Sequence, residues 1–247
     1  MAWCYDPKPL APSAVDTFGP TVLAFVSKRI IAEFVMSQAR SPKQQIHFSM
    51  LRSYQVADLL TLANAAAGTA AILSMMSYLS TAESWRVYLA LALIPMALAF
   101  DIADGRVARW RHKNSVFGQE LDSLADIVSF GVAPAALAYG LGMRGAVDEG
   151  ILIFFVTCGI SRLARYNVTA GQLADAAGKV RYFEGTPIPS SLLLVALLAL
   201  CFYLGHVGDD LPFGVVEVAS WRWHPVSALF FLNGCTMISK TLRIPKL

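Results

Sequence analysis

LLTLANAAAGTAAILSMMSYLSTA, residues 59–82, contains no Asp, Glu, Lys or Arg at any of its 24 positions. A second stretch of 24 residues, GTPIPSSLLLVALLALCFYLGHVG at 185–208, is equally free of these charged residues. About 20 apolar residues in a helix are enough to cross the ~30 Å hydrocarbon core of a bilayer. The two stretches therefore predict an α-helical membrane protein with more than one span.

The composition of the whole chain agrees with this interpretation. Of the 247 residues, 56% are hydrophobic and 15% are charged, and the mean hydropathy is +0.53. Soluble domains carry about 25% charged residues, so the deficit excludes a disordered chain and a solenoid of polar repeats. The net charge of +3 and the pI near 8.7 are too small for a surface that follows nucleic-acid phosphates. The length suggests one domain.

The expected fold class is an all-α integral membrane protein with six transmembrane helices plus an N-terminal amphipathic interfacial helix. Residues 1–20 are expected to form a flexible leader rather than a signal peptide. Residues 21–56 form an amphipathic, juxtamembrane segment that lies on the membrane surface or packs on the protein, and residues 57–247 form the six-helix domain. The six spans are expected at 57–79, 87–108, 119–141, 149–168, 187–205 and 224–241.

The distribution of basic residues supports an even number of spans. With six spans, 17 of the 20 Lys and Arg residues fall on the side that holds both termini, and only Arg86, Arg144 and Arg222 fall on the other. Basic residues are concentrated in cytoplasmic loops. Both termini are therefore expected in the cytoplasm, which leaves the glycosylation sequon at Asn167 unmodified.

Four aspartates are placed to meet at the cytoplasmic side of the bundle. The second span ends in DIADGRVAR at 101–109, and the third begins with GQELDSLAD at 118–126. At about 100° per residue, the carboxylates of each segment fall on one face of its helix. The short connection between the segments makes the two helices antiparallel neighbours, so the carboxylates of both segments converge.

Converging carboxylates in an apolar site require protonation or a bound cation. Hard oxygen ligands of this kind suit Mg²⁺ or Mn²⁺. Gly105 and Gly118 leave room for a bulky group against the backbone, and Arg109 supplies a cation for phosphate oxygens. These features together indicate a diphosphate site. The alternatives are interhelical hydrogen bonds, simple small-residue packing, or a path for ions.

The pattern D-x2-D-G-x2-A-R-x8-G-x3-D-x3-D resembles the signature of the CDP-alcohol phosphatidyltransferase family. It matches without a departure at Asp101, Asp104, Gly105, Ala108, Arg109, Gly118, Asp122 and Asp126. The resemblance implies a six-helix homodimer that transfers a phosphatidyl group from a CDP-linked lipid to an alcohol and releases CMP. In this interpretation the four aspartates hold the metal, and Asp126 is also the general base. The CDP-lipid binds along Asp104, Gly105, Ala108, Arg109 and Gly118.

Three further stretches, at 120–134, 161–167 and 182–189, resemble the serine-accepting branch of this family, and residues 47–64 resemble its fungal form. This resemblance implies CDP-diacylglycerol and L-serine as substrates, phosphatidylserine as product, and a location in the endoplasmic reticulum. Inositol, glycerol phosphate and an amino alcohol remain alternative acceptors. A cation transporter is the alternative from another class.

The serine site is expected around Arg162, Arg165 and Glu184. The two arginines lie one turn apart near the cytoplasmic end of the fourth span, where their charges need an acid, a lipid phosphate or a substrate. A guanidinium fork matches the serine carboxylate, and Glu184 is a candidate partner for its ammonium. Asn64 on the first span either donates to the nucleotide or bridges helices. The four histidines are expected to be loop or interface residues without a catalytic role.

Overall fold

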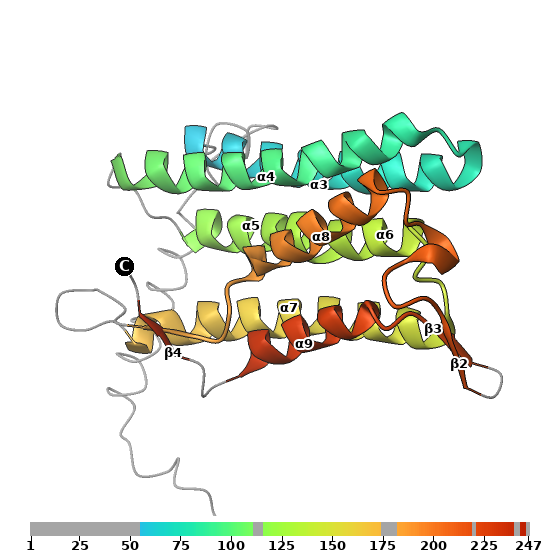
Figure 1. Ribbon diagram of the computed structural model, residues 1–247. Coiled ribbons are helices and arrows are strands. Elements are labelled where there is room, and N and C mark those ends of the chain that lie inside the picture. The colour runs from blue at the N-terminus through green and yellow to red at the C-terminus, as the bar shows by residue number, and fades with distance from the viewer. Residues whose placement is uncertain (1–54, 111–115, 174–181, 219–220, 240–242, 246–247) are drawn as a thin grey trace, which may run out of the picture. The chain divides into compact units, whose positions relative to one another are not determined.

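The computed structural model describes residues 55–110, 116–173, 182–218, 221–239 and 243–245. These residues are mostly helical (Figure 1). The expected leader and nearly all of the expected interfacial segment lie outside this part of the chain, so both stay predictions. The elements are α3 (Val56–Thr81), α4 (Ser84–Trp110), α5 (Val116–Asp126), η2 (Ile127–Val132), α6 (Ala133–Gly140), α7 (Ala146–Leu173), β1 (Tyr182–Glu184), η3 (Ile188–Ser190), α8 (Ser191–Tyr203), η4 (Gly208–Asp210), β2 (Val216–Val218), β3 (Trp221–Trp223), α9 (Ser227–Ile238) and β4 (Arg243–Pro245).

Among the described residues, three helical segments are long and apolar enough to cross a membrane. They are α3, α4 and the continuous segment Phe117–Gly140, which joins α5, η2 and α6. The apolar helices Ile188–Tyr203 and Ser227–Ile238 are shorter. α7 has sufficient length, but charged residues interrupt its apolar sequence near both ends. Each expected span thus coincides with a helix, while the number of helices that cross the bilayer stays a prediction.

The last two helices are shorter than the expected spans 187–205 and 224–241. η3 contains Pro189, and α8 begins only after it, at Ser191. α9 begins at Ser227, after the turn at Pro225. Pro lacks a backbone N–H and is confined to the first turn of a helix or to turns. Proline near each N-terminus therefore accounts for much of the shortening.

The helices are arranged in three layers (Figure 1). α3 and α4 form an antiparallel hairpin, in which Ala82 ends α3 in the left-handed conformation and its N–H bonds to the Tyr78 carbonyl. α3 also packs against α5, η2 and α6 in the middle layer, and α7 packs against α9 in the third. Two short antiparallel strand pairs, β1 with β4 and β2 with β3, were not expected from the sequence.

The contact between α3 and η2 is close enough to require a glycine. A Cβ placed on Gly68 would clash with the Cα and Oγ of Ser129, because both atoms would lie closer to it than van der Waals contact allows. Ser129 is fully buried and its hydroxyl donates to the Asn64 carbonyl at 2.9 Å. The absence of a side chain at Gly68 therefore allows the helix that carries the aspartates to approach α3.

We expect Gly68→Ala to destabilise the protein by about 1–3 kcal/mol, because the added methyl group overpacks this contact. The matched control is Gly150→Ala in α7, where an added Cβ has no neighbour within 4 Å. That change is expected to be neutral or to stabilise by up to about 1 kcal/mol through helix propensity. Thermal unfolding of both variants in detergent is the measurement, and equal midpoints would contradict the close contact.

Candidate active site

Three of the four signature aspartates form a compact group. Asp101 lies on α4, and Asp122 and Asp126 lie on α5. Each offers one carboxylate oxygen, and these oxygens all lie within 4.8 Å of one another. Asp126 is buried, and the other two are half-buried. Like charges at this separation repel strongly, so the group is arranged to share a cation or a proton.

The fourth aspartate makes a different contact. Asp104 is buried, and its Oδ2 accepts a hydrogen bond of 2.6 Å from the hydroxyl of Thr61 on α3. It does not belong to the group of three carboxylates. The structure therefore places Asp104 beside the group, with one carboxylate oxygen already bonded to the first described helix.

Asn64 connects α3 to the end of α5. Its Nδ2 donates to Asp126 Oδ1 at 3.3 Å, and its side chain is fully buried. The helix that carries Asp126 changes type directly after it, because Ile127–Val132 is a π-helix. Short π-segments inside α-helices are frequent at functional sites. In this structure Asn64 bridges two helices, which is one of the two roles expected for it.

Two buried oxygens at this site have no hydrogen-bond partner among the residues that the structure describes. They are Asp122 Oδ1 and Asn64 Oδ1. Buried polar atoms are nearly always bonded, and an unbonded one indicates a bound water, an ion or a functional role. A carboxylate oxygen without a partner, next to two further carboxylates, is suited to coordinate a hard divalent cation. The residues present therefore fit a metal such as Mg²⁺ or Mn²⁺.

The remaining signature residues lie beside the aspartates on the same two helices. A Cβ placed on Gly105 would have no neighbour within 4 Å, so this position borders open space. Ala108 is half-buried, and Arg109 is exposed in the last turn of α4. Gly118 is half-buried and lies one turn before Asp122. The two helices thus present small residues and one exposed cation next to the carboxylates.

Both arginines expected at the serine site lie on α7. The Nε of Arg162 is buried and has no hydrogen-bond partner, and Asp126 attracts its charge. Arg165 Nη1 donates to the carbonyl of Ile238 at the end of α9, at 3.4 Å. Neither guanidinium pairs with a carboxylate in the described part of the chain. Arg162 is therefore attracted by Asp126 of the aspartate group. Arg165 instead contacts the C-terminal end of α9.

Glu184 lies in β1, where its backbone pairs with Arg243 of β4. The side chain of Glu184 lies outside the part of the structure that is described. The loop after it is held by the bond from the Thr186 N–H to the Thr236 carbonyl, at 3.2 Å. The backbone of this loop is therefore anchored to α9, the same helix that Arg165 contacts.

Sequence reasoning did not single out Asp58 or Thr61 for the site. Asp58 is buried in the first turn of α3, where its carboxylate accepts from the Gln55 N–H at 2.8 Å. Together with Asn64, these residues form a stripe of polar side chains at every third position of an otherwise apolar span. Residues three and four apart lie on one face of a helix. This spacing in the sequence was the signal that could have indicated Asp58 and Thr61 as site residues.

The chain belongs to the CDP-alcohol phosphatidyltransferase family, whose model matches residues 54–231. The chain is 47% identical over 203 residues to the CDP-diacylglycerol–serine O-phosphatidyltransferase of Saccharomyces cerevisiae, a match that covers 81% of this chain and 74% of the yeast protein. It is 39% identical over 130 residues to the Helicobacter pylori protein of the same name, which covers 52% of each chain. It is 37% identical over 169 residues to the archaetidylserine synthase of Methanothermobacter thermautotrophicus, or 66% of this chain and 63% of that protein.

The contact between Thr61 and Asp104 gives a specific prediction. Thr61→Val keeps the volume of the side chain but removes the hydroxyl donor. We expect the free energy of unfolding to fall by about 1–3 kcal/mol, because the buried carboxylate of Asp104 loses its partner. Thr61→Ser keeps the hydroxyl and should retain most of the stability. The control is Thr69→Val on the same helix, since Thr69 is exposed and bonds only to the Ala65 carbonyl. Equal unfolding midpoints for the Thr61→Val and Thr69→Val variants would contradict this role.

Proposed function

We propose that the protein transfers the phosphatidyl group of CDP-diacylglycerol to the hydroxyl of L-serine, giving phosphatidylserine and CMP. The observation that carries this proposal is the 47% identity, over 81% of this chain, to a yeast enzyme named for that reaction. The region of similarity to the family includes every aspartate of the cluster. An acidic site at one end of the helices also suits chemistry better than ion transport, because transporters bind their ions near the bilayer midplane.

We propose that Asp101, Asp104, Asp122 and Asp126 hold one or two Mg²⁺ or Mn²⁺ ions. A divalent ion bound there would neutralise the diphosphate of the CDP-lipid. The unpartnered Asp122 Oδ1 supports this assignment. The fold brings three of these carboxylates together, and Asp104, fixed by Thr61, lies one turn beyond Asp101. Activity should therefore require the added ion and be lost after thorough chelation.

The CDP head group would lie along α4 and the start of α5. The open space beside Gly105 admits a bulky group against the backbone. The small residues Ala108 and Gly118 leave room for the head group at this surface, and the exposed Arg109 supplies donors for phosphate oxygens. Asn64, whose Oδ1 has no partner, can also contact the nucleotide without leaving Asp126. The lipid tails would stay in the bilayer.

Asp126 would accept the proton of the serine hydroxyl. The hydroxyl oxygen then attacks the phosphorus that carries the diacylglycerol, a new oxygen–phosphorus bond forms, and the bond to the CMP oxygen breaks. A hydroxyl needs a general base for this attack. Asn64 Nδ2 donates to Oδ1 of Asp126, and this bond leaves Oδ2 available to accept the proton. Positioning and charge neutralisation supply most of the rate in phosphoryl transfer.

Serine would bind on the α7 side of the cluster. Arg162 or Arg165 would hold its carboxylate and Glu184 its ammonium. The buried, unpartnered Nε of Arg162 supports a ligand at that position. Arg165 is already bonded to the Ile238 carbonyl, so it can hold serine directly or fix the neighbouring loop.

We further propose six spans, a homodimer, and a location in the endoplasmic reticulum with both termini and the aspartates facing the cytoplasm. The three basic residues expected on the side opposite the termini support this topology. Arg86 lies at the start of α4, Arg144 lies just before α7, and Arg222 lies in β3. Arg86 and Arg144 lie at helix ends opposite the aspartates, and Arg222 lies in the connection between α8 and α9.

The direct test is CMP release by the purified protein with CDP-diacylglycerol and a panel of acceptors. We expect turnover with serine and little with inositol, glycerol phosphate or ethanolamine, and no turnover in EDTA until Mg²⁺ or Mn²⁺ is restored. Preference for another acceptor would refute the serine assignment and leave the family. Full activity in chelated protein would refute the metal.

Substitution of single aspartates should separate binding from chemistry. We expect Asp126→Asn to abolish CMP release while CDP-diacylglycerol still binds, because the amide keeps the shape but cannot accept the proton. Asp101→Asn should instead weaken binding of the metal and the nucleotide. Equilibrium binding of a labelled CDP-lipid, measured beside the rate, checks both. Equal loss of binding in the two variants would remove this division of roles.

The two arginines on α7 give a further prediction. If Arg165 binds the serine carboxylate, Arg165→Ala should raise the KM for serine roughly 10- to 150-fold, the effect of one lost charge-assisted bond. Arg165→Lys should recover only part, because an ammonium lacks the fork. The KM for CDP-diacylglycerol is the internal control. The same two substitutions, to Ala and to Lys, made at Arg162 show which guanidinium holds serine. If a variant raises only the KM for the CDP-lipid, the substituted arginine binds phosphate instead.

A further inference from the structure

A cavity of about 300 Å³ lies at the end of the helices opposite the aspartates. Asp148, beside this cavity, lies in the first turn of α7, and Arg162 lies 14 residues further along the same helix. That separation is about 20 Å, so the cavity is distinct from the candidate active site. Its polar lining comes from the α6–α7 connection, η4 and the β3–α9 turn, and includes Arg144, Asp209, Arg222 and His224.

A buried pair of ionisable residues fixes one wall of this cavity. Asp148 is fully buried and His224 is 4% exposed. Asp148 Oδ2 contacts His224 Nδ1 at 2.7 Å, and Asp148 Oδ1 accepts from the His224 N–H at 2.9 Å. A carboxylate only accepts, so Nδ1 carries the proton. The other ring nitrogen, Nε2, is buried and has no hydrogen-bond partner in the described part of the chain.

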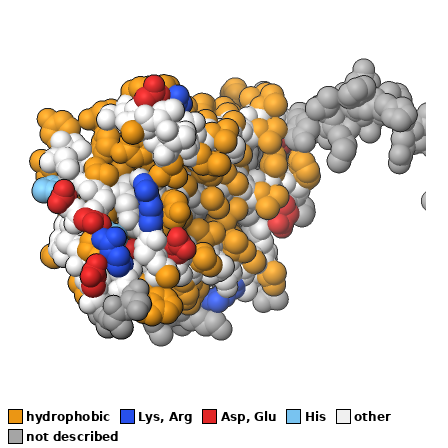
Figure 2. Space-filling model, turned by 90° about the vertical axis from the view of Figure 1, so that its right-hand side faces the viewer, with side chains coloured by type: hydrophobic (Ala, Val, Ile, Leu, Met, Phe, Trp, Pro, Cys, Tyr) orange, Lys and Arg blue, Asp and Glu red, His pale blue; other side chains and the backbone are white. Residues whose placement is uncertain are grey.

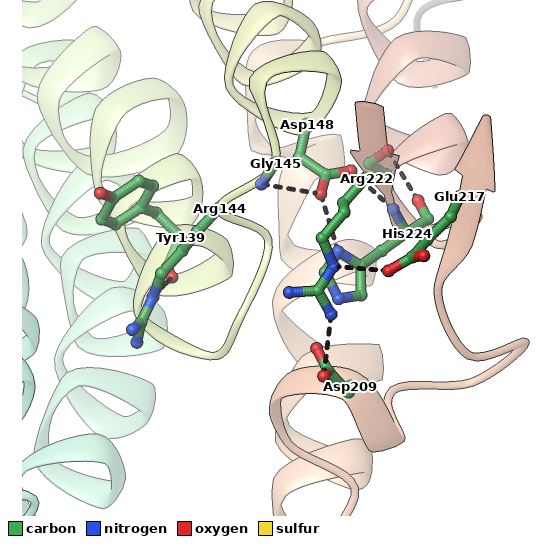
Figure 3. A network of polar contacts seen from close by, with 9 residues as sticks. Tyr139, Arg144, Gly145, Asp148, Asp209, Glu217, Arg222 and His224 are labelled. Carbon is green, nitrogen blue, oxygen red and sulfur yellow. Dashed lines mark hydrogen bonds and ion pairs between the residues drawn. The ribbon is translucent and has the colours of Figure 1, made fainter. Parts of the chain in front are cut away.

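Two arginines, Arg144 and Arg222, are among the residues that line the cavity, and Figure 3 shows their polar contacts. Arg222 donates to Asp209 at 2.9 Å and pairs with Glu217 at 3.2 Å. The hydrogen bond to Asp209 raises the pKa of Arg222 above its ordinary value, so this cation is permanent. Arg144 donates to the Tyr139 and Gly140 carbonyls at 3.1 and 3.0 Å. No carboxylate of the described residues lies within ion-pair distance of Arg144.

We propose that this cavity binds a phosphomonoester. Its anionic oxygens accept hydrogen bonds from the remaining N–H groups of Arg144 and Arg222, since Asp209 and Glu217 contact Arg222 only at Nη2 and Nε. Its remaining acidic P–OH donates to Nε2 of His224, which the protein itself leaves without a partner. A phosphodiester has no such proton, so the site distinguishes the two.

The surroundings of the cavity indicate a lipid as the source of the phosphate. Exposed aromatic side chains occur around this end of the helices, at Trp85, Tyr203, Phe213 and Trp221. Trp and Tyr are enriched where a membrane meets water. Figure 2 shows basic and acidic side chains gathered on this end, beside a broad hydrophobic surface. The volume is at the lower limit for ligand pockets, which suits a head group whose tails remain outside.

The test is the thermal unfolding of the full chain in phosphatidylcholine nanodiscs as a probe is added. The probes are dioctanoyl phosphatidic acid, inorganic phosphate and dioctanoyl phosphatidylcholine. A ligand of the folded state raises the midpoint progressively with its concentration. We compare wild type with Arg144→Gln and Arg222→Gln. The matched control is Arg86→Gln, which also breaks an ion pair at this end, with Glu83 at 2.6 Å, but does not line the cavity.

We expect phosphatidic acid to stabilise wild type and Arg86→Gln, with half-saturation at least about tenfold higher in both cavity variants, the effect of one lost charge-assisted bond. Asp126→Asn should respond as wild type, which separates this site from the aspartates. Equal stabilisation by inorganic phosphate, lost in the same variants, would support the site with free phosphate as its ligand. The proposal is overturned if neither phosphatidic acid nor inorganic phosphate stabilises wild type, if the cavity variants respond normally, or if phosphatidylcholine acts equally well. Circular dichroism before heating establishes that each variant is folded, and Arg144→Lys, which keeps the charge, should fall between.

Discussion

Carboxylates held inside a bundle of apolar helices need partners from another helix, and α3 supplies them. Thr61 donates to Asp104, and Asn64 donates to Asp126. An unpaired charge in such surroundings costs several kcal/mol, so these two contacts decide where α4 and α5 lie along α3. The close approach at Gly68 follows from the same arrangement, because α3 reaches the aspartates only if its backbone nearly touches η2.

Most helices were predictable because their signals are strong and local. A run of 24 uncharged residues predicts α3, and the spacing of aspartates on 101–126 predicts two antiparallel helices with their acids together. The lengths of α8 and α9 were less accessible. Hydropathy continues through Pro187 and Pro225, whereas the helices begin after them. β1 pairs with β4 from a segment far away in the sequence, so no local pattern indicates that pair, whereas β2 and β3 are separated only by residues 219–220.

The residues of the candidate site also differ in how far the sequence could predict them. Residues that belong to the signature could be named from sequence, since their spacing is specific. Asp58 and Thr61 carry only the weaker signal of their spacing with Asn64. A Thr in an apolar helix usually bonds to its own backbone, and only the position of α4 gives Thr61 a second partner. His224 was expected in a loop or at an interface; it does follow β3, but it is buried against Asp148 from an element 76 residues earlier.

The π-helix after Asp126 makes the number of residues in this helix as important as their identity. In η2 the Ala133 N–H reaches back five residues to the Val128 carbonyl, so the segment holds one residue more than an α-helix would. One residue corresponds to about 100° of rotation. A chain shortened by one residue between Asp126 and Ala133 could still form an unbroken apolar helix, yet its aspartates would point about a quarter-turn away from Asn64 once Leu137 had entered the core. Alignments of this family should therefore be read for gaps here as carefully as for the aspartates themselves.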